Sequence, residues 1–339
     1  MSKLSYYISI DYLRTIAAIL ISYYHFVNFE SSNGALFEVD HPIRTSSHYL
    51  SDVVFVFFLI SGFIIPLSMQ RQHFKLSKFA HFLLRRWVRI EIPYVGSIGL
   101  ILLIGLLWSL KSGIPYEING WQVMHHLTYT TAFSGFDWLN KIYWTLAIEF
   151  QFYVIIALIF PLLFSKNTWI RYSTLLLFGA SFLLLEDLRM IFRYAPLFTL
   201  GILYLFYSTE PERKTLHLIL MVAFLVATWF SLGLSPALYT AAALLVIHLM
   251  NSVESEPFNA GKTTYSFYLT HGAIGGTIVY FANNYVENTW LKFGTVLLAI
   301  VASFVFSAIY YRLIELPSQR LSRKITISSE LPSEHKPKH

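Results

Sequence analysis

Apolar stretches of about 20 residues recur along most of this sequence, and they restrict what the chain can fold into. A helix of about 20 apolar residues is the length needed to cross the hydrocarbon core of a bilayer. Only 13% of the 339 residues are charged, about half of the ~25% found in soluble domains. The sequence therefore predicts an all-α fold, a polytopic membrane helix bundle. It excludes a soluble globular enzyme, a disordered chain and a nucleic-acid-binding domain.

Read with this length, the sequence contains about ten candidate transmembrane helices. They are 8–28, 50–70, 90–110, 142–164, 171–186, 188–208, 216–232, 236–251, 263–285 and 293–314. We treat the first as a retained helix rather than a signal peptide, because no small-residue cleavage site follows it. We expect residues 1–324 to form one transmembrane domain and the polar residues 325–339 to form a disordered cytoplasmic tail.

The distribution of lysine and arginine predicts the orientation of these helices. If the N-terminus is cytoplasmic, five of the 25 basic residues lie outside: Arg44, Lys111, Lys141, Arg189 and Lys292. Arg14 and Arg193 lie within spans, and the remaining 18 face the cytoplasm. Cytoplasmic segments of membrane proteins are enriched in lysine and arginine, so we expect both termini to be cytoplasmic. The net charge of +6 is then explained by orientation rather than by nucleic-acid binding.

The chain contains no cysteine, which excludes disulfides, a thiolate nucleophile and a cysteine-based metal site. It also contains none of four common catalytic or nucleotide-binding motifs: a P-loop, G-x-G-x-x-G, H-E-x-x-H or a G-x-S-x-G elbow. The loop histidines show no metal-ligand spacing, so we expect no bound metal. Hydrolase and NTPase functions therefore lack their usual sequence support.

Three ionisable residues lie in the first predicted span: Asp11, Arg14 and His25. Each costs a few kcal/mol to insert, so such residues usually face the bundle interior and mark a function. Arg14 and His25 are separated by about 1,100° of helical rotation, which places them on one face about 16 Å apart. Asp11 lies one turn before Arg14, at the spacing of an ion pair. The alternative is an interfacial ion pair and a hydrogen-bonded core histidine.

Glu149 lies in the fourth predicted span, about 9 Å from its outer end. His25 lies about 5 Å from the outer end of its own helix, so the two side chains can meet at a similar depth. A carboxylate beside an imidazole holds one tautomer and raises the basicity of the other nitrogen. The alternative is a lone glutamic acid that is protonated in a dry bundle.

Two further groups of polar residues lie near the cytoplasmic side of this topology. Arg86 and Arg89 are one turn apart if helical, and arginine forks suit phosphate. The alternative for this basic segment is a topology signal that contacts anionic lipid. His271 lies about 12 Å inside the ninth span, where a hydrogen-bonded core histidine is equally compatible with the sequence.

Six segments occur in a characteristic order. They are 10–18 (IDYLRTIAA) followed by His25, 57–63 (FFLISGF), 85–89 (RRWVR), 144–153 (WTLAIEFQFY), 265–271 (YSFYLTH) and 314–317 (IELP). Together they resemble the motifs of the acyltransferase-3 family of integral membrane acyltransferases, in its single-domain form without a hydrolase-like extension. The departures from the family pattern are Tyr12 for Gly, Thr145 for Ser, Phe150 for an often acidic residue and Leu316 for Arg.

The resemblance implies a multi-pass enzyme of the cell (inner) membrane. It would move an acyl group, most simply acetyl, from cytoplasmic acetyl-CoA to a hydroxyl of a surface glycan or lipid-linked saccharide. The implied roles are catalysis by His25 and Glu149, donor binding by Arg14, Arg86, Arg89, Ser266 and His271, and support by Asp11, Ser61 and Tyr153.

Two other functions are compatible with the same residues. Buried Asp, Arg, His and Glu also form proton relays in secondary transporters, although the sequence shows no evident inverted repeat. A receptor or scaffold subunit would use these groups as interhelical contacts. The sequence does not identify the acceptor sugar or the acyl chain, and it leaves open whether the chain forms a homo-oligomer.

Overall fold

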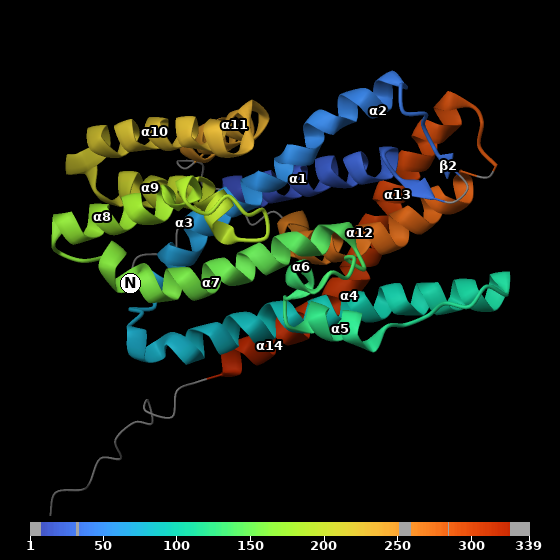
Figure 1. Ribbon diagram of the computed structural model, residues 1–339, viewed down its shortest axis with the longest axis horizontal. Coiled ribbons are helices and arrows are strands. Elements are labelled where there is room, and N and C mark those ends of the chain that lie inside the picture. Colours follow the sequence, from blue (N-terminus) through green and yellow to red (C-terminus); the bar gives the residue numbers. More distant parts are fainter. Residues whose placement is uncertain (1–7, 32–33, 251–258, 284, 326–339) are drawn as a thin grey trace, which may run out of the picture.

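The chain folds into a bundle of long helices that run roughly parallel or antiparallel to one another (Figure 1). A computed structural model describes residues 8–31, 34–250, 259–283 and 285–325. The long helices are α1 (Ile8–Val27), α3 (Phe55–Arg71), α4 (Phe79–Ser112), α7 (Trp144–Leu163), α9 (Ala195–Thr209), α10 (Lys214–Leu232), α11 (Leu234–Met250), α12 (Asn259–Ala282) and α13 (Thr289–Tyr310).

Shorter elements connect them. They are the two-residue antiparallel strands β1 (Glu30–Ser31) and β2 (Gly34–Ala35), α2 (Pro42–Ser47), α5 (Gly120–Leu127), α6 (Thr131–Ser134), α8 (Thr168–Gly179) and α14 (Leu316–Lys324). Short 3₁₀ turns are η1 (His48–Val54), η2 (Leu76–Lys78), η3 (Lys141–Tyr143), η4 (Ser181–Leu183), η5 (Ile191–Tyr194) and η6 (Pro211–Arg213). A single π-helical turn, η7 (Tyr311–Glu315), joins α13 to α14.

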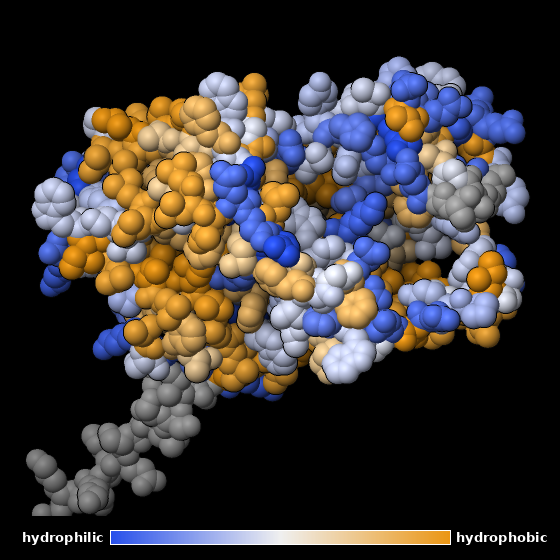
Figure 2. Space-filling model, in the orientation of Figure 1, coloured by the Kyte–Doolittle hydropathy of each residue, from blue (hydrophilic) through white to orange (hydrophobic). Residues whose placement is uncertain are grey.

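The predicted all-α membrane bundle is confirmed. Among the described residues, six helical segments are long and apolar enough to cross a membrane, and α11 is a shorter apolar helix. Exposed hydrophobic side chains cover α8, α10 and α11, as Figure 2 shows on the left of the molecule. This surface suits contact with lipid chains. The count of ten spans and the sides on which the termini lie remain predictions.

Two predicted spans differ from the structure. The fifth, 171–186, is replaced by α8, whose 12 residues are too few for the roughly 20 that cross a bilayer. The third begins eleven residues earlier than expected, because α4 starts at Phe79 and not at residue 90. The arginine motif therefore lies on the first turns of a helix and not in a loop. Apart from Ile325, the expected disordered tail lies outside the described residues.

Two long helices outside the strongly apolar set, α1 and α12, pack against each other. They are 20 and 24 residues long, yet polar residues keep both out of the strongly apolar set. A hydrogen bond of 3.2 Å joins Thr15 of α1 to Thr264 of α12, and both side chains are buried. Small polar residues of this kind allow close packing and bond across helices in a membrane. The pairing keeps the polar faces of both helices away from lipid.

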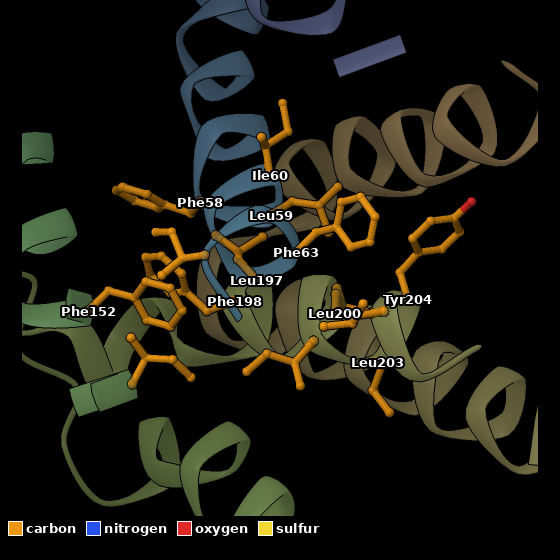
Figure 3. Close-up of a cluster of buried hydrophobic side chains, with 14 of the residues drawn as sticks. Phe58, Leu59, Ile60, Phe63, Phe152, Leu197, Phe198, Leu200, Leu203 and Tyr204 are labelled. Carbon is orange, nitrogen blue, oxygen red and sulfur yellow. The ribbon is translucent and has the colours of Figure 1, made fainter. Parts of the chain in front are cut away.

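The largest apolar core lies where α3, α9 and α7 meet (Figure 3). Phe198 of α9 stacks on Phe152 of α7 at 4.2 Å and on Phe58 of α3 at 5.1 Å between ring centroids. The backbones of α3 and α9 approach closely at Gly62 and Gly201. A Cβ atom on Gly62 would lie 2.2 Å from the carbonyl oxygen of Phe198. The approach therefore depends on the absence of a side chain, as in other small-residue helix contacts.

We predict that Gly62→Ala destabilises the protein, because the added methyl meets backbone atoms that cannot move independently. Overpacking of this kind costs about 1–3 kcal/mol, which lowers the thermal midpoint by roughly 5 °C. The measurement is thermal unfolding of the purified protein in detergent. Gly99→Ala on α4 is the matched control, because nothing lies within 4 Å of its added Cβ. Equal midpoints for the two variants would contradict the close approach of α3 and α9.

Candidate functional site

A cavity of about 340 Å³ opens where the first turns of α4 meet α3 and α14. We call this end of the bundle, where α1 begins, the basic end. The cavity is lined by Ser68, Met69, Gln72, Phe74, Lys78, His81, Phe82, Arg85, Arg86, Arg89, Ser322, Arg323 and Ile325. Five of these side chains are cationic, and the lining contains no carboxylate. A site of this size and charge is suited to an anionic small molecule.

Arg86 also lines a region deeper in the bundle together with Glu149, Tyr153 and Tyr129, and this region is packed too tightly to hold a water molecule. The guanidinium carbon of Arg86 lies 5.5 Å from the centre of the Tyr153 ring, at cation–π distance. The Tyr153 hydroxyl donates to Oε1 of Glu149 at 2.5 Å. The Ser61 hydroxyl donates to the same oxygen at 3.3 Å. Glu149, Tyr153 and Ser61 thus form one hydrogen-bonded group beside Arg86.

Arg14 of α1 lies close to the same group. Its charge interacts most strongly with Glu149 and then with Arg89 and Asp11. No ion pair joins Asp11 to Arg14 in the described part of the chain, and the Asp11 side chain packs against Gly261 at the start of α12. We call Arg14, Arg86, Arg89 and Glu149 the arginine cluster. Its single carboxylate lies among three guanidinium groups, so the cluster keeps a net positive charge.

His25 lies apart from the arginine cluster and next to His271. The two ring centroids are 5.5 Å apart. His271 is only 1% exposed, and its Nδ1 lies 2.7 Å from the carbonyl oxygen of Tyr268. Because a carbonyl only accepts, Nδ1 carries the proton and Nε2 carries the lone pair. This Nε2 has no hydrogen-bond partner among the described residues. An unpaired, fully buried acceptor of this kind is available to a hydroxyl group.

The depth of the histidine pair follows from the register of α7 and α12. The hydroxyl of Tyr268 is hydrogen-bonded to Thr145 at 2.8 Å, and Asn140 lies beside Gly272, so the two helices are antiparallel. Glu149 is four residues from this contact in one direction, and His271 is three residues from it in the other. At 1.5 Å per residue the two lie about 10 Å apart along the bundle. No hydrogen bond or ion pair joins Glu149 to His25 in the described part of the chain, contrary to the expected pairing.

The Ser266 hydroxyl already has a protein partner. Ser266 is fully buried, and its hydroxyl donates to Oε2 of Glu315 at 2.5 Å. Its backbone N–H donates to the same oxygen at 3.1 Å, and Gln319 donates to Oε1. These bonds join α12 to the π-helical turn, so the geometry assigns Ser266 to packing rather than to direct contact with a donor.

Comparisons with known proteins identify the family to which the chain belongs. A family model described as an acyltransferase domain, acyltransferase-3, matches residues 7–312. The chain belongs to the acyltransferase-3 family. Peptidoglycan O-acetyltransferase OatA from Listeria monocytogenes is 29% identical over 181 residues. That stretch covers 50% of this chain and only 26% of the relative. No solved structure was found to match the chain.

Gln151, two residues after Glu149, holds a connection between two helices. The Gln151 side chain donates to the carbonyl of Arg189 at 2.9 Å and accepts from the N–H of Ile191 at 2.8 Å. These bonds hold the connection between α8 and α9 against α7.

In the same connection, hydrogen bonds from Arg189 lower the pKa of Asp187 to about 2. This exposed ion pair therefore stays charged at neutral pH.

Two buried carboxylates of this acyltransferase were not among the predicted site residues. Glu91 of α4 is 3% exposed and accepts from the Tyr129 hydroxyl at 2.7 Å. Tyr129 comes from the segment between α5 and α6, which reaches into the bundle and stacks its ring between Tyr94 and Phe150. Glu315 is the second. An acidic residue inside an apolar run was the available signal for Glu91.

No group of three or more His, Asp and Glu residues in the described ranges is arranged to hold a metal ion. The cationic cavity is instead suited to an anionic organic ligand. The site therefore consists of the cationic cavity, the arginine cluster and a separate buried histidine pair.

We predict that Glu315→Ala destabilises the transmembrane domain, because it leaves the buried Ser266 hydroxyl and N–H without an acceptor. Losing hydrogen bonds to a charged acceptor costs about 2–3 kcal/mol. The measurement is the thermal unfolding midpoint in detergent. Glu287→Ala removes an exposed carboxylate and serves as the control. If the midpoint of Glu315→Ala equals that of the control, the hydrogen bonds between Glu315 and Ser266 do not stabilise the domain.

Proposed function

We propose that the protein transfers an acyl group, most simply acetyl, from a coenzyme A thioester to a hydroxyl of a surface glycan. The observation that carries this proposal is the alignment of three features across the bundle. The cationic cavity lies at the basic end, the arginine cluster lies deeper, and the histidine pair lies beyond it. A donor with anionic phosphates suits the cationic cavity and the arginine cluster. An acceptor with a neutral hydroxyl suits the histidine pair.

The charge of the cavity supports coenzyme A as the donor. Coenzyme A carries a diphosphate and a 3′-phosphate at one end and the thioester at the other. Arginine binds phosphate through two parallel hydrogen bonds. Arg86 and Arg89 would hold the phosphates at the basic end, and the thioester arm would extend past Arg14 toward His25. In the topology that the basic residues favour, this end faces the cytoplasm, where acetyl-CoA is made.

His25 is the proposed general base. It would accept the proton of the acceptor hydroxyl as that oxygen attacks the thioester carbonyl carbon. The carbon–sulfur bond then breaks, and the thiolate leaves with the bonding electron pair and takes up the proton from the His25 imidazolium. The products are the acylated glycan and free coenzyme A. The thioester is already activated, so a single base suffices for the transfer.

The geometry changes the supporting roles that the sequence suggested. His271, and not Glu149, is the neighbour of His25, and its unpaired Nε2 provides a second acceptor for a hydroxyl. Glu149 accepts hydrogen bonds from Tyr153 and Ser61 and interacts with Arg14. We propose that it orients the arginine cluster on the donor path. Removing it would then affect donor use before it affects proton transfer.

The acceptor class rests on the relative. OatA is by its name a peptidoglycan O-acetyltransferase, and a glycan hydroxyl outside the cell is the corresponding proposal for this chain. The extended apolar surface supports a multi-pass location in the cell membrane. The donor at the basic end and the acceptor at the other end would let the protein carry an acyl group across the bilayer.

The proposed orientation predicts where reporters fused to the chain will be active. A reporter placed after residue 339 should read cytoplasmic, and one inserted within 113–119, before α5, should read extracytoplasmic. The measurement is a pair of alkaline phosphatase and green fluorescent protein fusions at each position. Reversed activities at either position would contradict entry of the donor at the basic end.

We predict that His25→Gln almost abolishes acyl transfer without loss of folded protein. Losing a general base costs about 10²–10⁴-fold in rate, whereas a packing defect lowers the amount of protein instead. The assay follows radiolabelled acetyl-CoA added to inverted membrane vesicles and the label recovered on glycan. Coenzyme A binding by the purified variant should be unchanged, because His25 lies apart from the cationic cavity.

Glu149→Gln is the comparison, and its defect should appear mainly as a higher KM for acetyl-CoA. A well-expressed His25→Gln variant that retains more than about a tenth of the transfer rate would contradict the base assignment. Uptake of solute by vesicles without labelling of glycan would contradict the enzyme and favour a proton-coupled transporter.

A further inference from the structure

The C-terminal helix α14 forms one wall of the cationic cavity, although it lies outside the stretch that the family model matches. That match ends at residue 312, and α14 covers Leu316–Lys324. Figure 1 shows α14 beside α4 at the lower side of the bundle, and the two helices are in contact. Ser322, Arg323 and Ile325 all line the cavity. Part of the cavity is therefore built by residues to which the family assignment gives no role.

Two serines attach α14 to the turns of α4 that carry the arginines. The Ser318 hydroxyl lies 2.9 Å from the carbonyl oxygens of both Val88 and Arg89. The Ser322 hydroxyl donates to the carbonyl oxygen of Arg85 at 2.8 Å. The two serines are four residues apart, so they lie on one face of α14. Both are buried, which fixes the register of α14 against α4.

These bonds have a specific consequence for the arginines. The carbonyls of Arg85 and Val88 lie inside a helix, where each also receives the N–H of the residue four positions later and uses its second lone pair for the serine. The carbonyl of Arg89 has no such donor, because the residue four positions later is Pro93, and the Ser318 hydroxyl supplies the hydrogen bond instead. The two hydroxyls position α14 next to the backbone of Arg85 and Arg89, so that Arg323 faces the same cavity as these two side chains.

The charges around the cavity favour an anionic occupant. Lys78, Arg85, Arg86, Arg89 and Arg323 surround it without a carboxylate in the lining. The side chains of Arg85, Arg89 and Arg323 make no ion pair with the described residues. Like charges held this close repel one another unless an anion lies between them. A ligand with several phosphate charges matches this arrangement.

We propose that α14 completes the donor site and that Arg323 binds a phosphate of the coenzyme A donor. This inference rests on the proposed function, since it assigns the ligand of the cavity to the acyl donor. Anionic lipid headgroups share the phosphate chemistry, so the test must separate the two ligands. Arg320 lies one turn earlier on the exposed surface of α14 and does not line the cavity, which makes it a matched control.

The experiment compares full-length wild-type protein with Arg323→Ala and Arg320→Ala, each in nanodiscs of uncharged lipid. The first measurement is the Kd of coenzyme A and of 3′-dephospho-coenzyme A by titration calorimetry. The second is the KM and kcat for acetyl-CoA in the transfer assay. Losing one charge-assisted phosphate contact should raise both Kd and KM for the donor by about tenfold, with kcat unchanged. Arg320→Ala should stay within about twofold of wild type, because Arg320 does not line the cavity.

Two further variants strengthen the comparison. Arg323→Lys keeps the charge and should recover part of the affinity, while Arg86→Ala should show a donor defect of its own. If Arg323 contacts the 3′-phosphate, Arg323→Ala will not weaken binding of 3′-dephospho-coenzyme A further. If it contacts the diphosphate, both ligands will weaken equally. Either pattern supports the assignment to the donor site.

Three outcomes separate the ways in which the inference can fail. Equal donor Kd values for Arg323→Ala and Arg320→Ala would overturn the role of α14 and leave the proposed function intact. A wild-type protein that does not bind coenzyme A would overturn the proposed donor itself. Unchanged coenzyme A binding with weaker binding of Arg323→Ala to phosphatidylglycerol vesicles would identify a lipid site and overturn the donor assignment.

Discussion

The cost of placing ionisable side chains in a bilayer sets the arrangement of this bundle. A charged group near the membrane centre is unfavourable by several kcal/mol unless it faces protein or water. Arg14 and His25 on α1 and His271 on α12 are such groups, and the two helices that carry them pack together. The apolar helices α10, α11 and α13 present many exposed hydrophobic side chains instead. The polar pair can exist in a membrane because α11 and α13 pack beside it and separate part of it from lipid.

The same arrangement places the arginine cluster and the histidine pair at different depths in the bundle. The arginine cluster holds Glu149 near the basic end, where a phosphate-bearing ligand has access to the cavity. His25 and His271 lie about 10 Å further along the bundle, and His271 is tied through Nδ1 to a backbone carbonyl. A neutral imidazole pair is suited to a hydroxyl, and guanidinium groups are suited to phosphate. The proposed function uses these two depths for the two ends of an acyl-CoA molecule.

The C-terminal segment holds these two regions in register. Glu315 accepts two hydrogen bonds from Ser266 on the histidine-bearing helix α12. A few residues later, Ser318 and Ser322 bond to the backbone of the arginine-bearing helix α4. The π-helical turn between α13 and α14 places the Glu315 side chain toward α12. Such turns are often found at functional positions. The helix carrying His271, the neighbour of the proposed base, and the helix carrying the donor arginines are thus joined by one short segment.

The sequence by itself determined the all-α membrane class, because runs of about 20 apolar residues have few other folds available. It also indicated the family, since the motifs depend on local spacing. The structure decided that Arg86 and Arg89 lie on a helix, because α4 begins at Phe79 and not at residue 90. Only the tertiary structure decided which polar groups meet. Depth estimates along single helices suggested that Glu149 meets His25, but the Thr145–Tyr268 contact sets the register of α7 against α12 and separates them. The roles of Glu91, Ser266 and Arg323 depend on contacts between segments far apart in sequence, and a helical pattern carries no information about such contacts.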